Sequence, residues 1–245
     1  MTSTIDQAEV EKFSRIADEW WSETGKFKPL HKFNPIRISL IRKKIAEHFS
    51  ADQKSLTLFS GLKIIDIGCG GGLMAEPFAR MGASITAIDA SEKNITVAKI
   101  HAKKSGLEIN YRVNAAEEIA LENEKYDVVL ALEVIEHVAD AESFIKSCSA
   151  LLKPNGLLFV ATINRTLKSL ALAKFAAEYV LRWLPIGTHD WKKFMKPSEV
   201  SNYAASLNLE LKELRGFNFN ILRDEWKETG DLDVNYIAIF SKPNS

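Results

Sequence analysis

The sequence predicts an α/β fold built on a doubly wound, mostly parallel sheet, and two observations carry that prediction. An apolar run at 62–67 leads into a glycine-rich turn, and a second apolar run at 84–88 leads into the carboxylate of Asp89. A sheet of this kind binds an adenosine-containing cofactor by means of a tight turn after one strand and an acidic residue after the next strand. Further strand patterns alternate with helical patterns, at 109–113, 126–132 and 157–162.

Elements at both ends of the chain complete the expected sheet. Apolar residues at helical spacing predict a helix over 7–23, and a second helix follows over 36–49 after the irregular stretch 26–35. Near the C-terminus, two strand patterns have no helical pattern between them, at 209–214 and 234–240. We therefore expect a mostly parallel seven-stranded sheet with an antiparallel pair at its C-terminal edge.

The length of 245 residues fits one large domain. We expect a single domain, 1–245, made of four consecutive parts. The first two parts are an N-terminal helical cap at 1–60 and a cofactor-binding core at 61–163. A helical insertion at 164–196 serves as a membrane or substrate lid, and a C-terminal helix with edge strands follows at 197–245.

Composition excludes several classes of partner and compartment. The 32 basic and 32 acidic side chains cancel, so no net charge draws the protein to nucleic acid. The two cysteines, Cys69 and Cys148, give no disulfide framework and fit a reducing compartment. The first residues include acidic side chains and no apolar segment, and no apolar run reaches the roughly 18 residues of a membrane span. We expect a cytoplasmic protein with no nucleic-acid partner.

The glycine-rich turn after the first strand favours one adenosine cofactor over another. Its pattern is D-x-G-x-G-x-G, whereas the dinucleotide fingerprint G-x-G-x-x-G would need a glycine where Leu73 stands. A pyrophosphate is an anion, which the Asp66 carboxylate at the strand end would repel. S-adenosylmethionine carries cationic ammonium and sulfonium groups, which suit Asp66. We predict an S-adenosylmethionine site in which Gly68 and Gly70 approach the cofactor and Asp89 binds the ribose hydroxyls.

Polar side chains also follow the fourth strand, at the edge of the sheet where ligands bind. Glu133, Glu136 and His137 offer two carboxylates and an imidazole, a set that can ligate Mg²⁺. The same carboxylates would equally complement the dipole of a helix N-terminus. Farther along, the pair His189 and Asp190 offers either a general base or a lining for a substrate pocket.

Arg37 is the candidate partner for the carboxylate of the cofactor. A guanidinium binds a carboxylate with two parallel hydrogen bonds, which gives both charge and orientation. Taken alone, Arg37 fits an ordinary surface position better than a ligand contact.

The insertion over 168–184 has an unusually wide apolar arc. Four charged residues would fall within about a third of a helical circumference, and they are Lys168, Lys174, Glu178 and Arg182. Such a helix either packs as core or lid, or lies in a lipid interface with its basic residues at the headgroups. The residues alone leave both interpretations open.

Specific motifs match a known family across nearly the whole chain. They stand at 27–31, 34–37, 133–137, 162–165, 187–190 and 233–236. With them the chain resembles the bacterial ubiquinone-biosynthesis O-methyltransferases, a family of class I methyltransferases with a Rossmann-like fold. The glycine turn and Asp89 are less specific, because many methyltransferases share them.

The resemblance implies site residues and partners. It implies that the cofactor is contacted by Arg37, Gly68, Asp89 and Leu132. It also strengthens the hypothesis that Mg²⁺ is bound by Glu133, Glu136 and His137. The family acts on phenols and quinols with long isoprenoid tails, so the insertion is expected to contact the membrane peripherally. An assembly of ubiquinone-biosynthesis enzymes is a further expected partner.

The expected reaction is in-line transfer of the sulfonium methyl to a ring hydroxyl of a polyprenylated catechol or demethylubiquinol. A phenol with a pKa of about 10 is a poor nucleophile at neutral pH. Either a metal favours the phenolate or a side chain takes the proton, which makes Glu133, His137 and His189 the catalytic candidates. Two rivals stay open, a C-methyltransferase of quinone biosynthesis and a cofactor-binding scaffold without turnover.

Overall fold

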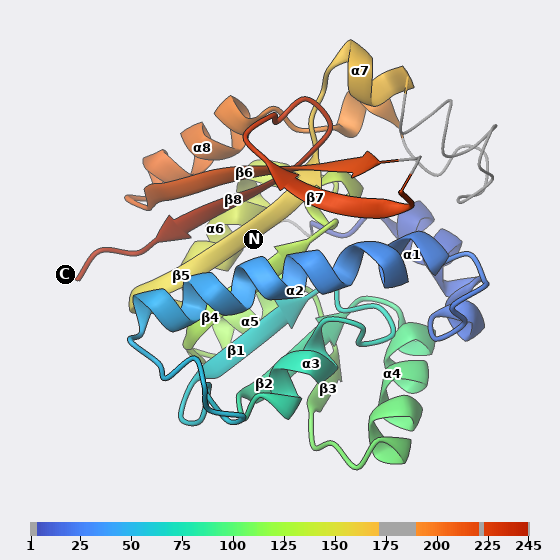
Figure 1. Ribbon diagram of the computed structural model, residues 1–245, viewed down its shortest axis with the longest axis vertical. Helices are drawn as coiled ribbons and strands as arrows, with labels where there is room; N and C mark the ends of the chain where they lie inside the picture. Colours follow the sequence, from blue (N-terminus) through green and yellow to red (C-terminus); the bar gives the residue numbers. More distant parts are fainter. Residues whose placement is uncertain (1–3, 172–189, 221–222, 245) are drawn as a thin grey trace.

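The computed structural model describes residues 4–171, 190–220 and 223–244 of the chain (Figure 1). Within them, eight strands form one sheet, namely β1 Lys63–Ile67, β2 Ser84–Asp89, β3 Asn110–Val113, β4 Tyr126–Leu132, β5 Leu152–Ile163, β6 Glu210–Asn220, β7 Glu225–Thr229 and β8 Asn235–Ser241. The order across the sheet is β3-β2-β1-β4-β5-β8-β6-β7. The first five strands are mutually parallel, and β8, β6 and β7 add to β5 as antiparallel neighbours.

Helices cover both faces of this sheet. They are α1 Gln7–Ser14, α2 Lys28–His48, α3 Ala75–Arg80, α4 Glu92–Lys104, α5 Ala116–Leu121, α6 Ala141–Leu151, α7 Leu167–Ser169 and α8 Pro197–Ser206, with short 3₁₀ turns at Ala17–Glu19, Ile135–His137 and Trp191–Lys193. Figure 1 shows α2 running across one face of the sheet, with α6 behind the strands. Because β1 pairs with both β2 and β4, the crossovers diverge there, and a crevice opens beyond the carboxyl ends of these strands.

The strands alternate their side chains between two hydrophobic cores. Ile64 and Phe159 point to the core under α2, α3 and α4, whereas Ile65 and Val160 point to the core under α5, α6 and α8. Both faces of a parallel sheet are buried, so its strands read as continuous apolar runs. This is why β1, β2, β4 and β5 could be predicted from the sequence, and the structure confirms them. The structure also confirms β3, whose sequence NYRV has one buried residue and whose prediction rested on the alternation of strand and helix patterns.

The expected strand count was wrong by one. The predicted antiparallel edge is confirmed, since β6 pairs with β8, but a further strand, β7, follows β6 as a hairpin. β7 has the sequence EWKET, and none of its residues is fully buried. An edge strand whose side chains are charged and exposed to solvent has no apolar run from which it could be predicted.

The expected start of the second helix was also wrong. α2 begins at Lys28, inside the stretch predicted to be irregular, and it contains Pro35. Pro29 lies in the first turn, where a missing N–H costs little. Burial of Phe33 and Arg37 against the rest of the fold accompanies the helical path through Pro35. Tertiary packing therefore overrides the local signal of two prolines.

Two glycines, one in β6 and one just after β7, differ in the space around them, and this difference predicts the effect of replacing each. A Cβ at Gly216 would lie 1.8 Å from the carbonyl oxygen of Asp231, whereas a Cβ at Gly230 would meet nothing within 4 Å. We expect Gly216→Ala to lower the free energy of unfolding by roughly 1–3 kcal/mol, because backbone has to move. Gly230→Ala, the matched control, is expected to stay within about 0.5 kcal/mol of wild type. Urea denaturation measures both, and equal effects would contradict this account.

Candidate functional site

A cavity of about 150 Å³ lies beyond the carboxyl ends of β1, β2, β3 and β4. Five residues singled out in the sequence line it, namely Gly68, Gly70, Asp89, Glu133 and His137. The turn after β3 adds Asn114, Ala115 and Ala116. Arg37, Asp66, Leu132 and Glu136 are not among the lining residues and lie behind this surface, each at most 8% exposed.

The glycine turn is closely packed on several sides. Gly68 and Gly70 both have a left-handed backbone, with φ of 68° and 52°. A Cβ at Gly68 would come within 2.4 Å of Val134, and one at Gly70 within 2.3 Å of the Trp20 ring. Glycine is therefore required at both positions by backbone conformation and by the side chains that press on the turn.

Asp89 is held at the end of β2 by three donors. The Gly70 amide donates to Oδ2 at 2.9 Å, and Oδ1 accepts from the Ser91 amide at 2.8 Å and from Asn94 Nδ2 at 3.1 Å. Burial raises the pKa of Asp89, and these hydrogen bonds oppose that rise. Three of the four usual acceptor sites of the carboxylate are thereby filled, which leaves one site on Oδ2 for a ligand hydroxyl at the edge of the cavity.

Asp66 and Arg37 form a buried charged centre under the turn. Burial raises the pKa of Asp66 from 3.8 to about 7, while Arg37 acts to lower it and Asp89 to raise it. Among the residues that the structure describes, Asp66 Oδ2 and Arg37 Nε are both buried and have no hydrogen-bond partner. Unpaired polar atoms of this kind are costly and are concentrated at functional sites.

Arg37 is positioned by α2 and by the residue after β4. Its Nη1 donates to Glu133 Oε1 at 3.0 Å, its Nη2 donates to Asn34, and the guanidinium lies 4.4 Å from the Phe33 ring centre. Glu133 itself has φ of +57°, a left-handed conformation that costs a non-glycine residue energy. The end of β4 therefore holds Glu133 in a strained position beside Arg37.

The predicted metal ligands are not gathered into one set. Glu133 pairs with Arg37, and His137 Nδ1 contacts Glu9 Oε2 of α1 at 3.0 Å. Glu136 is buried, accepts from Thr162 Oγ1 at 2.8 Å, and has its pKa raised by burial and by the neighbouring Glu133. In the part of the chain that the structure describes, no group of three acidic, histidine or cysteine side chains is arranged to hold a metal. As arranged, these residues do not fit Mg²⁺ ligation.

An N-terminal strap, residues 4–27, lies within the part of the chain expected to form a helical cap, and it forms one wall of the cavity. Thr4 donates to the Glu117 carboxylate from both its amide and its hydroxyl at 2.7 Å, and Ile5 bridges to Val138. Strap residues on the cavity wall include Glu9, Phe13 and Trp20. The helix predicted over 7–23 is shorter in the structure: α1 ends at Ser14, and a 3₁₀ turn at Ala17–Glu19 and further turns follow. The helical pattern of the sequence marks only the apolar face of this segment.

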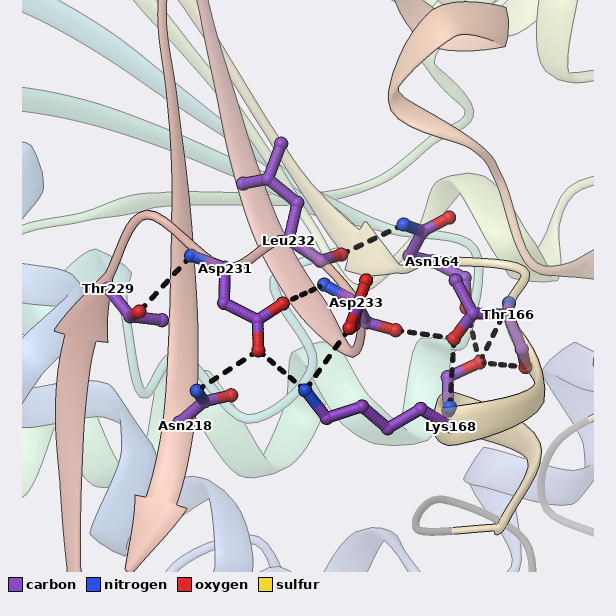
Figure 2. A network of polar contacts seen from close by, with 9 residues as sticks. Asn164, Thr166, Lys168, Asn218, Thr229, Asp231, Leu232 and Asp233 are labelled. Carbon is purple, nitrogen blue, oxygen red and sulfur yellow. Dashed lines mark hydrogen bonds and ion pairs between the residues drawn. The ribbon is translucent and has the colours of Figure 1, made fainter.

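A polar network fixes the start of the segment that follows β5, as Figure 2 shows. Lys168 Nζ contacts Asp231 at 2.5 Å and Asp233 at 3.2 Å, both in the loop between β7 and β8. Asn164 Nδ2 donates to the Leu232 carbonyl at 2.8 Å, and Thr166 Oγ1 donates to the Asp233 carbonyl at 2.6 Å. The sequence motifs around 162–165 and 233–236 therefore meet in space, where they join β5 to the C-terminal edge.

Two sequence predictions fall on residues that the structure does not describe. His189 lies outside the described residues, and so does most of the insertion at 168–184. Among the helices that are described, none combines the length and apolarity needed to cross a bilayer.

The chain is similar to curated enzymes along nearly its whole length. A family model described as a methyltransferase domain matches residues 65–160. The ubiquinone biosynthesis O-methyltransferase of Rhizobium etli is 54% identical over 241 residues, which are 98% of this chain and 97% of that protein. The protein of the same name from Pelagibacter ubique is 54% identical over 240 residues, 98% of this chain and 99% of that protein.

Solved structures show the same fold at low identity. A magnesium protoporphyrin IX methyltransferase from Synechocystis PCC 6803, with bound S-adenosylmethionine, superposes with a TM-score of 0.61 at 15% identity, covering 99% of this chain and 100% of that one. An N-methyltransferase from Bradyrhizobium japonicum, in complex with S-adenosylhomocysteine, gives 0.60 at 17% identity, covering 96% and 98%. The Rossmann-like methyltransferase fold expected from the sequence is thereby confirmed.

The raised pKa of Asp66 predicts a pH dependence of stability. Between pH 3.8 and about 7 the folded carboxyl keeps a proton that the unfolded carboxyl has lost. The stability that this proton confers is present below pH 3.8 and is lost as pH rises through about 7. Asp66→Asn is expected to remove this decline, which has a limit of about 1.4 kcal/mol per pH unit for one proton.

Urea denaturation at pH 5, 6 and 7 measures the two slopes. Asp231→Asn is the matched control, because contact with Lys168 lowers the pKa of Asp231 to about 2, outside this range. Its stability should follow the wild-type slope. Parallel curves for wild type and Asp66→Asn would show that Asp66 does not titrate in this window.

Proposed function

Because the chain belongs to the ubiquinone biosynthesis O-methyltransferases, we propose that its cavity binds S-adenosylmethionine and that a ring hydroxyl of a polyprenylated catechol or demethylubiquinol is methylated there. Dependence on S-adenosylmethionine is common to this family and fold. The observation that carries the proposal is the glycine turn beside a fixed Asp89 at the switch point of the sheet.

The residues around the cavity fit the parts of this cofactor. Asp89, which keeps one acceptor site on Oδ2, is the proposed partner of the ribose hydroxyls, and the backbone of Gly68 leaves room for the nucleoside. The buried Asp66 carboxyl supplies negative charge near the cationic end. Arg37 is the proposed partner of the cofactor's carboxylate, and Glu133, which accepts from Arg37 Nη1, would have to move aside for a bidentate pair with Nη1 and Nη2. Leu132 lies 8% exposed at the end of β4, behind this surface.

The chemistry needs a nucleophilic oxygen aligned with the methyl group. The bound cofactor supplies an electrophilic methyl on sulfur. As the phenol oxygen forms its bond to the methyl carbon, the carbon–sulfur bond breaks, its electron pair stays on sulfur, and the hydroxyl proton leaves. We assign that proton to His137, on the cavity wall. Its contact with Glu9 at 3.0 Å orients the ring and favours Nε2 as the basic nitrogen.

Mg²⁺ stays a hypothesis, and no step above uses it. The two carboxyls Glu133 and Glu136 are neighbours, but His137 is engaged with the strap. Equilibrium dialysis of chelator-treated protein against Mg²⁺ tests the hypothesis. One bound ion per chain, lost in Glu133→Gln, would support it, whereas the absence of a bound ion would contradict it.

The substrate carries a long isoprenoid tail, and we propose that segment 168–184 contacts the membrane peripherally while the enzyme works from the cytoplasmic side. The apolar composition of this segment supports the proposal. An assembly of ubiquinone-biosynthesis enzymes is the further proposed partner, and His189 is a second proposed base. Co-sedimentation with anionic liposomes tests the membrane contact, and loss of binding on deletion of 169–184 is the supporting result.

Transfer of labelled methyl from S-adenosylmethionine to a short-tailed prenylated catechol tests the reaction. We expect the label on a ring oxygen of the product. Asp89→Ala should lower cofactor affinity by about tenfold to a hundredfold, because charge-assisted hydrogen bonding to the ribose is lost. Label on a ring carbon would indicate a C-methyltransferase. Binding of the cofactor without transfer to any such catechol would indicate a scaffold.

His137→Ala tests the base. We expect kcat to fall by about a hundredfold or more, within the usual contribution of a general base, while the affinity for S-adenosylhomocysteine changes little. Glu9→Gln, which keeps a hydrogen-bond acceptor but no charge, should have a smaller effect on kcat. A near wild-type kcat in His137→Ala would remove His137 from the mechanism and leave His189 as the candidate.

A further inference from the structure

Trp20 of the strap packs directly on the glycine turn. A Cβ at Gly70 would lie 2.3 Å from its ring, and one at Gly71 would lie 2.4 Å from its side chain. The same indole stacks on Phe27, with ring centres 3.7 Å apart and planes 9° from parallel. Trp20 is only 8% exposed, so its position and the direction of its N–H are fixed by packing.

The indole N–H of Trp20 begins a chain of hydrogen bonds that ends on Asp89. Trp20 Nε1 donates to Asn94 Oδ1 at 2.9 Å, and Asn94 Nδ2 donates to Asp89 Oδ1 at 3.1 Å. Asn94 is 2% exposed. An indole N–H can only donate, so it defines which end of the Asn94 amide is oxygen and which end is left to donate to Asp89.

Trp20 thus affects both oxygens of Asp89. It acts on Oδ1 through Asn94, and it packs against Gly70, whose amide donates to Oδ2 at 2.9 Å. A second strap contact reaches the same place, because Ser14 Oγ lies 2.6 Å from Ser91 Oγ at the start of α4. No other described segment joins the cover of the cavity to the carboxylate at its edge by such a chain.

We propose that Asn94 is a positioning residue that couples closure of the strap to binding of the cofactor's ribose. This inference rests on the proposed function, since it takes Asp89 as the ribose ligand. With the strap closed, Asn94 is held by Trp20 and presents its amide N–H to Asp89. With the strap displaced, the amide loses that constraint and Asp89 loses its fixed orientation toward the two hydroxyls.

Thermodynamic linkage makes the coupling reciprocal. A ligand that uses Asp89 stabilises the closed strap, and a strap that cannot close weakens that ligand. Strap residues line one side of the cavity, so movement of the strap changes the wall that a bound cofactor contacts. The residues that carry the coupling, Trp20 and Asn94, touch no reacting atom in this account.

The test compares two ligands that differ by one hydroxyl, S-adenosylhomocysteine and its 2′-deoxy analogue, by calorimetry. The ratio of their affinities reports the contact between Asp89 and the ribose. We expect the wild-type ratio to fall at least fivefold in Asn94→Ala and in Trp20→Phe, which keeps an aromatic ring but has no N–H. The double variant should lose less than the two single losses combined, because both substitutions break the same path from Trp20 through Asn94 to Oδ1.

Trp21→Phe is the matched control. Trp21 is the neighbouring strap residue, and its Nε1 donates to the Gly71 carbonyl at 2.9 Å without reaching Asp89. A general loosening of the strap would lower both affinities and leave the ratio unchanged, so Trp21→Phe is expected to keep the ratio within twofold of wild type.

Three results would overturn the inference, and they are distinguishable. A wild-type ratio in Asn94→Ala would show that Asn94 does not position Asp89, and this variant decides the question alone if Trp20→Phe does not fold. Additive losses in the double variant would show that Trp20 does not act through Asn94. A wild-type protein that binds neither ligand, or an Asp89→Asn variant with an unchanged ratio, would instead remove the proposed function or its ribose contact, on which the inference rests.

Discussion

The hydrogen bond from the Gly70 amide to Asp89 is the contact on which the rest of the site depends. It joins the turn after β1 to the end of β2 and sets the direction of the carboxylate. Gly70 makes it from a left-handed conformation, with φ of 52°, and the missing Cβ leaves the space that Trp20 fills. One glycine therefore provides the donor for Asp89 and the docking surface for the strap that covers the cavity.

Around this contact, acidic side chains outnumber basic ones. Asp66 and Glu136 are buried and Asp89 is partly exposed at the cavity, all three have pKa values raised by desolvation, and Arg37 is buried beside them. Burial of like charges is unfavourable, so the site is less stable alone than with a cationic ligand nearby. A sulfonium cofactor with an ammonium group supplies the missing positive charge, which links the stability of the site to its occupancy.

Sequence reasoning succeeded where short-range chemistry decides the structure. The five parallel strands, the glycine-rich turn and the acidic end of β2 follow from apolar runs, from the alternation of strand and helix patterns, and from residues a few positions apart. It failed at β7, which has no apolar run, and at the start of α2, where two prolines gave the wrong local signal. The grouping of Glu133, Glu136 and His137 also looked like a ligand set because they are close in sequence. Arg37 and Glu9, remote in the chain, take two of these side chains as partners.

The sequence by itself determined the class of the fold, the strand ends that form the crevice and the kind of cofactor that suits them. Each of these is encoded by residue type and local spacing, which act before any long-range contact forms. Tertiary structure alone decided that the strap lines the cavity and that the Trp20 indole hydrogen-bonds to Asn94, which in turn donates to Asp89. Trp20 and Asn94 are 74 positions apart along the chain, so only the packing of distant segments brings them together. Tertiary structure also decided which polar atoms stay unpaired, because burial depends on how distant segments pack and not on the residue itself.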